Sequence, residues 1–137
     1  MEMNIIQKIK ELNLPASQYV VVGSSTMDVL GIRPAGDIDI AVTKELHQEL
    51  RKTGKWKEYE KYNKIFLVDD TFEIIPELFW EGYDTTTKEA ISSALIIEGI
   101  PFMNLDEVVK FKTAMDREKD IRDIELIKKY KERNSQG

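Results

Sequence analysis

Two acidic residues at alternating positions of a short apolar segment are the first candidates for chemistry. Asp37 and Asp39 stand at positions i and i+2 of the segment Asp37–Val42, with isoleucines between and after them. Successive side chains of a β-strand point to opposite faces, so both carboxylates would lie on one face, close together. Two such charges repel unless a cation lies between them. Mg²⁺ or Mn²⁺, completed by substrate phosphates, is the expected occupant.

A glycine-serine turn precedes this acidic pair. The apolar run Tyr19–Val22 predicts a buried strand that ends at Gly23-Ser24. Gly23 has no side chain, so its backbone can approach a ligand closely, and the N-terminus of a following helix attracts phosphate. Ser25, with Asp28 three residues later, resembles a capping box and is the expected N-cap. Capping by Ser24 or Ser25 is compatible with nucleotide binding by both.

A lysine lies within the apolar stripe of a predicted helix near the C-terminus. Lys112 shares helical spacing with Leu105, Val108, Val109 and Met115. A buried ammonium needs an anionic partner. A bound phosphate is one alternative, and Asp120 or Asp123, predicted to face inward from the next helix, is the other. Asp120 and Asp123 are expected to be mainly structural partners of nearby basic side chains, ahead of any catalytic role.

The elements that position these residues alternate along the chain. Helices are expected over residues 4–13, from Ser25 to about Gly31, and over 44–52, 86–93, 104–115 and 120–131. Strands are expected over residues 19–22, 37–42, 64–68 and 71–75, and over 95–103 as a strand pair or one bent strand. This order predicts a single α+β (mixed α/β) domain over residues 1–137, with a small mixed sheet flanked by helices and a C-terminal helical pair.

The composition restricts the class of protein. The chain has 137 residues, of which 42% are hydrophobic and 33% charged, as in soluble globular proteins. No apolar run approaches the roughly 20 residues that span a bilayer, and no signal-peptide core is present, so a cytoplasmic protein without membrane contact is expected. The absence of cysteine excludes disulfides and thiolate zinc sites. A net charge of −5 argues against a broad basic surface for nucleic acid.

The motifs in this order resemble a known group of proteins. Gly23-Ser24 followed by Asp37-Ile38-Asp39 resembles the signature of the DNA polymerase beta-like nucleotidyltransferase superfamily. The stretches GSSTMDVLGIRPAGDIDIAV and NLDEVVKFKTAMDREKDIRDIELI are similar to the small bacterial members, which include the minimal nucleotidyltransferases and the AbiEii-type toxins. The resemblance spans nearly all of the chain. It implies a nucleotidyltransferase-like fold, a triphosphate at the Gly-Ser turn and a divalent metal on the two aspartates.

The resemblance also implies a third carboxylate beside the acidic strand, and it contains one departure. Glu73 is the candidate for this carboxylate, as a general base or a further metal ligand, and Glu77 is the second choice. The alternative for Glu73 is an ordinary half-exposed acid on a strand, without a role in the reaction. The segment Ser25–Met27 replaces the arginine-bearing part of the usual turn. Arg33 or Lys112 would supply the missing positive charge.

The expected function is therefore Mg²⁺-dependent transfer of a nucleoside monophosphate from a nucleoside triphosphate to an acceptor hydroxyl. The acceptor is a small molecule, a protein or a tRNA, and a toxin-antitoxin type of system is one setting for the reaction. A homodimer or a partner protein would complete the site. The alternatives are a catalytically inactive nucleotide-binding or regulatory module and a structural interaction protein. Phe79, Trp80 and Tyr83 are interpreted as core or rim residues in preference to base-stacking groups.

Overall fold

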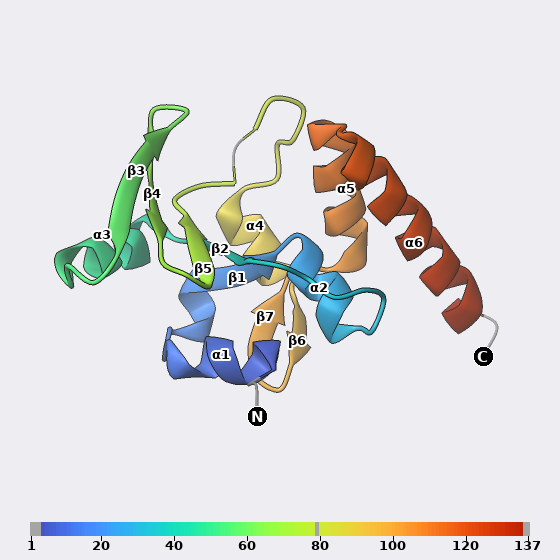
Figure 1. Ribbon diagram of the computed structural model, residues 1–137, viewed down its shortest axis with the longest axis horizontal. Coiled ribbons are helices and arrows are strands. Elements are labelled where there is room, and N and C mark those ends of the chain that lie inside the picture. The colour runs from blue at the N-terminus through green and yellow to red at the C-terminus, as the bar shows by residue number, and fades with distance from the viewer. Residues whose placement is uncertain (1–3, 79, 136–137) are drawn as a thin grey trace.

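A mixed seven-stranded sheet lies at the centre of the molecule (Figure 1), whose computed structural model describes residues 4–78 and 80–135. The strands are β1 (Tyr19–Val22), β2 (Ile38–Val42), β3 (Lys57–Lys61), β4 (Lys64–Val68), β5 (Phe72–Ile75), β6 (Leu95–Ile97) and β7 (Ile100–Phe102). Their order across the sheet is β3-β4-β5-β2-β1-β7-β6. The helices are α1 (Ile5–Glu11), α2 (Ser24–Val29), α3 (Lys44–Lys52), α4 (Thr87–Ser92), α5 (Leu105–Met115) and α6 (Glu118–Ser135), with a 3₁₀ turn at Ala16–Gln18.

The strand pairing is mixed, which confirms the predicted α+β class. β2 lies between antiparallel β1 and parallel β5, and β1 also pairs in parallel with β7. The remaining pairs, β3 with β4, β4 with β5 and β6 with β7, are antiparallel hairpins. None of the helices in residues 4–78 and 80–135 combines the length and the apolar character needed to cross a bilayer.

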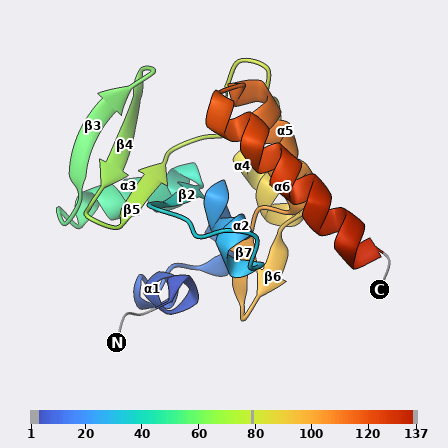
Figure 2. The same ribbon diagram turned by 45° about the vertical axis from the view of Figure 1, so that its right-hand side comes forward.

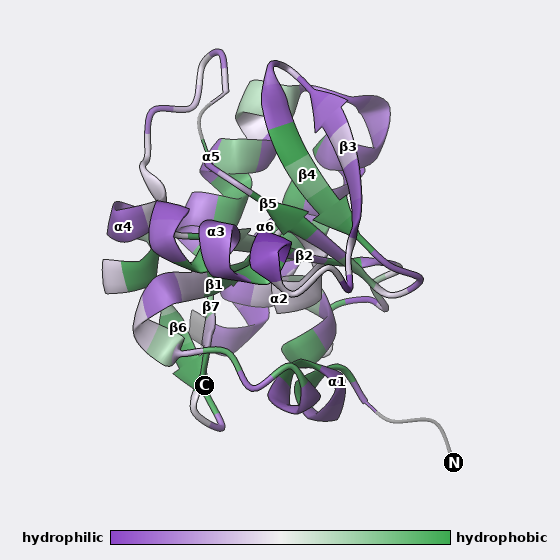
Figure 3. Cartoon of the chain, turned by 90° about the vertical axis from the view of Figure 1, so that its left-hand side faces the viewer, coloured by the Kyte–Doolittle hydropathy of each residue, from purple (hydrophilic) through white to green (hydrophobic). Residues whose placement is uncertain are grey.

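Each face of the sheet has its own hydrophobic core. Ile38 and Ile40 of β2 point to the face that α1 and α3 cover, through buried residues such as Ile9 and Leu46. Ala41, on the opposite side of the same strand, belongs to the core beneath α2, α4, α5 and α6. In Figure 3 β5 and much of β4 are green, whereas α3 and α4 are mainly purple. Asp39 lies on the second face because strand side chains alternate.

One strand, β3, was not predicted from the sequence. β3 is an edge strand, and four of its five side chains are exposed, so its sequence KEYEK carries no hydrophobic alternation. Only Tyr59 is half-buried. In Figures 1 and 2 the β3–β4 hairpin projects from the sheet on the side opposite the α5–α6 pair. Residues 95–103 form two strands, β6 and β7, which resolves the alternative left by the sequence.

The predicted capping box of α2 is wrong. The helix begins at Ser24, its N-cap is Gly23, and no side chain caps it. Ser25 is 1% exposed and points into the protein, where its hydroxyl has no hydrogen-bond partner among the described residues. The Asp28 carboxylate instead accepts a hydrogen bond from the backbone N–H of Ala35, 2.8 Å away. Asp28 thus holds the loop from α2 to β2.

Candidate active site

A cavity of about 420 Å³ opens on the second face of the sheet. Its walls come from the β1–α2 turn, the α2–β2 loop, strands β2, β3, β4 and β5, the loop after β5, and helices α5 and α6. Six of the seven residues predicted for the site line it: Gly23, Ser24, Asp37, Asp39, Glu73 and Lys112. Segments far apart in the sequence therefore meet at the location that the motifs indicate.

The carboxylates of Asp39 and Glu73 lie on neighbouring parallel strands. Asp39 of β2 is the direct register partner of Glu73 of β5, so the two side chains leave the sheet side by side on one face. Asp37 precedes β2 by one residue and is exposed at the cavity. Burial, together with the negative charges of Glu73 and Asp37, raises the pKa of Asp39 to about 7. We call Asp37, Asp39 and Glu73 the acidic cluster. The raised pKa of Asp39 indicates that nearby positive charges do not fully compensate the negative charge of this cluster.

The turn at Gly23 faces the same carboxylates. Gly23 has φ 68° and ψ −137°, a conformation that L side chains rarely adopt. A Cβ at this position would lie 3.9 Å from Oδ2 of Asp39, so the turn and the acidic residue are in van der Waals range. Glycine is therefore required by the backbone, and the turn forms the wall of the cavity opposite β2.

Two cations meet the hydroxyl of Ser24. Nη2 of Arg33 donates to Ser24 Oγ at 2.7 Å, and Nζ of Lys112 lies 3.5 Å from the same oxygen. Arg33 comes from the loop between α2 and β2 and Lys112 from α5. The positive charge that the turn itself lacks is thus supplied from two distant segments.

Asp123 holds both cations in place. Its carboxylate accepts two hydrogen bonds of 2.7 Å from Arg33 and one of 2.8 Å from Lys112. Burial alone would raise the pKa of Asp123, but the hydrogen bonds from the two cations outweigh burial and lower it. Lys112 is 5% exposed, so it is a structurally paired lysine that also reaches the cavity wall. The structure therefore shows the carboxylate partner predicted for Lys112, and phosphate binding by this lysine stays a prediction.

A second ion pair fixes the start of α6. Asp120 is fully buried and accepts hydrogen bonds from Arg117 at 2.7 Å and 3.2 Å. Nζ of Lys112 lies 3.6 Å from Oδ1 of the same carboxylate. Asp120 and Asp123 therefore both face inward, as predicted, and join α6 to α5.

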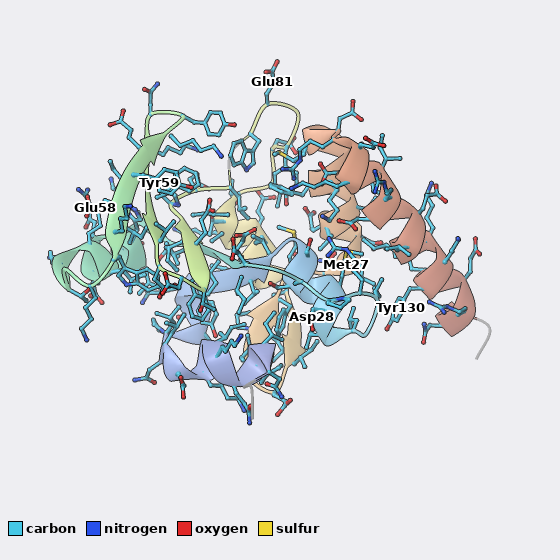
Figure 4. The ribbon with its side chains drawn as sticks, viewed as in Figure 1. Met27, Asp28, Glu58, Tyr59, Glu81 and Tyr130 are labelled. Carbon is cyan, nitrogen blue, oxygen red and sulfur yellow. The ribbon has the colours of Figure 1, made fainter. Side chains whose placement is uncertain are left out.

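Tyr59 is a site residue that sequence reasoning missed. Its hydroxyl donates a hydrogen bond of 2.9 Å to Oε1 of Glu73, and burial, followed by this contact, raises the pKa of Tyr59 to about 12. Tyr59 lies on β3, and Figure 4 shows it on that strand with Glu58 beside it. The one usable signal is the single aromatic residue at the centre of KEYEK.

Three predicted residues do not reach the cavity or lie outside the described part of the chain. Ser25 is not among the lining residues, and the second-choice acid Glu77 instead accepts a hydrogen bond of 2.8 Å from Thr87 Oγ1. Phe79 lies outside the described residues. Tyr83 is a core residue at 1% exposure, whereas Trp80 lines the cavity as a rim residue.

No ready-made metal cluster is present in the described part of the chain. Within residues 4–78 and 80–135, no three Asp, Glu, His or Cys side chains form a group that could hold a metal ion. The Asp37–Asp39 pair offers oxygen ligands of the kind that Mg²⁺ takes, and Mg²⁺ commonly uses one or two carboxylates with substrate phosphates and water. The donor set therefore fits a cation that arrives with a polyphosphate.

Comparison of the chain with protein-family models, with curated proteins and with solved structures gives no match in any of the three. The fold class is thus defined by the architecture itself.

Proposed function

We propose that this protein is a nucleotidyltransferase, which binds a nucleoside triphosphate with Mg²⁺ and transfers the nucleoside monophosphate to an acceptor hydroxyl. The observation that supports this most directly is the side-by-side placement of Asp39 and Glu73 beside the glycine turn. Carboxylates brought together in a half-buried position require a cation, and a helix N-terminus with nearby cations favours phosphate. A magnesium-bound polyphosphate satisfies both demands in one cavity.

Each residue has a distinct role in the proposed reaction. Asp37 and Asp39 would hold Mg²⁺, which when bound neutralises charge on the phosphate oxygens. Gly23 and Ser24 line the wall along which the phosphates would lie, and Lys112 lies behind them.

Glu73 would take the proton from the acceptor hydroxyl, and the hydrogen bond from Tyr59 orients its carboxylate for this. The acceptor oxygen then bonds to the α-phosphorus, the bond from that phosphorus to the bridging oxygen breaks, and pyrophosphate leaves. The acceptor is a small molecule, a protein or a tRNA, and a labelling experiment identifies which of these classes receives the nucleoside monophosphate.

A catalytically inactive nucleotide-binding module is the second candidate. Its support is the segment Ser25–Met27, which replaces the arginine-bearing part of the turn, and the engagement of both Arg33 and Lys112 by Asp123. Such a module would bind nucleotide and have no need of a base. Glu73 therefore separates the two candidates.

Calorimetric titration with each nucleoside triphosphate and Mg²⁺ tests the binding step. We expect binding by the wild type that is lost in the Asp37→Asn/Asp39→Asn variant and kept in Asp70→Asn, whose exposed carboxylate lies in the β4–β5 turn. Binding that is equal in all three proteins would refute the assignment of the aspartates.

Incubation of the protein with α-labelled triphosphates, Mg²⁺ and a cell lysate tests the transfer step. We expect a labelled product with the wild type and with Glu60→Gln, an exposed acid of β3, and none with Glu73→Gln, which should still bind nucleotide. If the lysate is labelled equally by Glu73→Gln, Glu73 is not the base. Nucleotide binding without any labelled product favours the inactive module.

A further inference from the structure

The lining of the cavity combines polar and apolar side chains. Besides the Gly23-Ser24 turn and the acidic cluster, it includes the apolar side chains of Trp80, Phe111 and Met115, and the cations Lys61, Arg117 and Lys119 also line it. A triphosphate requires only the polar groups. The apolar side chains are therefore available to a flat apolar part of the same ligand.

Aromatic rings from three segments meet beside the cavity: Trp80 and Phe111 line it, and Tyr62 contacts Trp80. The ring of Tyr62, in the β3–β4 turn, lies 4.8 Å from that of Trp80 at an interplanar angle of 86°. Trp80 in turn lies 6.4 Å from Phe111 of α5 at 74°. We call these three residues the aromatic rim. Edge-to-face contacts of this kind are favourable, and they join the hairpin, the loop after β5 and α5.

The indole of Trp80 is held by ring contacts without a hydrogen bond. Its Nε1–H is buried and has no acceptor among the residues that the structure describes. Buried donors usually find a partner. Because this donor has none among the described residues, no hydrogen bond fixes the orientation of the indole ring. A ligand that offers a flat surface can therefore compete for its packing.

Tyr62 occupies an unusual position for an aromatic residue. It forms a two-residue turn with Asn63, and both have positive φ values, 55° and 60°. Turns of this kind favour asparagine and glycine, because other residues are strained there. Tyr62 is nevertheless 61% exposed as a residue, and Nζ of Lys61 lies 5.3 Å from the centre of its ring. Because Tyr62 is exposed, packing in the core does not offset its unfavourable backbone conformation. An aromatic residue kept at such a position points to a role in contacting a ligand.

We propose that the aromatic rim is the nucleobase subsite of the cavity. The base of the nucleoside triphosphate stacks against Trp80 and Tyr62, while its phosphates lie along the turn at Gly23 and Ser24. This inference rests on the proposed function, because the phosphates would lie at the proposed reaction site. It adds that the base, and not the triphosphate alone, contributes to affinity.

The test compares ATP with inorganic tripolyphosphate, which carries the same phosphate chain and no base. The chain has two tryptophans, so in a Trp56→Phe background the fluorescence reports Trp80 alone. Trp56 packs against the core on the opposite face of the sheet. With Mg²⁺ present, we expect ATP to change the Trp80 emission and to bind at least about fivefold more tightly than tripolyphosphate, since base stacking on an aromatic side chain contributes about 1 kcal/mol or more.

Tyr62→Ala in the same background should remove most of this preference for ATP and leave the affinity for tripolyphosphate unchanged. Because Tyr62 is exposed, this variant should fold normally. Tyr130→Ala, which removes an aromatic ring of α6 that is not part of the aromatic rim, should keep the full preference.

Equal affinity of the wild type for ATP and tripolyphosphate, or an unchanged preference in Tyr62→Ala, would overturn the nucleobase subsite while leaving the proposed function in place. Failure of both ligands to bind in the presence of Mg²⁺ would overturn the two proposals together.

Discussion

Replacement of Asp39 by asparagine should stabilise the free protein at neutral and alkaline pH. The carboxylate of Asp39 is desolvated and lies beside Glu73 and Asp37, and these causes raise its pKa from 3.8 to about 7. Between these two values the folded protein keeps a proton that the unfolded chain has released. The free energy of unfolding therefore falls as the pH rises through this window, and above about pH 7 the full cost of the charge is present.

The pKa change sets the size of the effect. The interval from 3.8 to about 7 corresponds to at most about 4 kcal/mol. Contact of Asp39 with water in the cavity screens the neighbouring charges, so we expect about 1.5–2 kcal/mol. Asparagine stays neutral at every pH and has nearly the same shape, which makes Asp39→Asn a direct measure of this charge.

The assay is urea denaturation of the wild type and of Asp39→Asn at pH 4.5, 6 and 8, with EDTA present to remove metal ions. The stability difference in favour of Asp39→Asn should grow steadily with pH. Asp70→Asn, an exposed acid in the β4–β5 turn, should show no such growth. A variant that is no more stable than the wild type at pH 8, with the same pH dependence, would contradict the argument that the acidic cluster is electrostatically strained.

Two further substitutions test the parts that surround the acidic cluster. Gly23→Ala should lower the free energy of unfolding by about 1–3 kcal/mol, because its φ of 68° is unfavourable for alanine; thermal denaturation measures this, and an unchanged Tm would contradict the conformational argument. Asp123→Asn should destabilise the protein by about 3–5 kcal/mol at pH 7 in urea denaturation, because Arg33 and Lys112 lose their common anionic partner. Glu125→Gln, on the exposed side of the same helix, should change stability by less than about 0.5 kcal/mol, and an equally small effect of Asp123→Asn would show that its ion pairs contribute little.

The local features of the site are readable from the sequence because they depend on periodicity. Strand alternation in residues 37–42 assigns Asp39 to the face opposite Ile38 and Ile40, and the structure confirms this. Helical spacing likewise places Lys112 in the apolar stripe of α5 and predicts that it needs an anionic partner. Each of these inferences uses residues only a few positions apart.

Local patterns fail where a residue's environment comes from elsewhere. The capping box at Ser25 follows a valid rule, but the chain turns at Gly23 and buries Ser25. β3 is a strand because β4 pairs with it, and its exposed edge leaves no hydrophobic pattern. The hydrogen bond from Tyr59 to Glu73 depends on that pairing and could not be predicted.

The sequence by itself determined the types of element, the face that each candidate side chain takes and the need of Lys112 for a counter-charge. The resemblance predicted Glu73 beside the acidic strand, but only the tertiary structure decided its direct register with Asp39 and the contact of Arg33 with Asp123, 90 positions later in the chain. Periodicity records which side of a strand or helix faces the core, and it carries no information on which other element lies there. Strand order, parallel register and helix docking supply that information, because they follow from burying all the apolar faces at once.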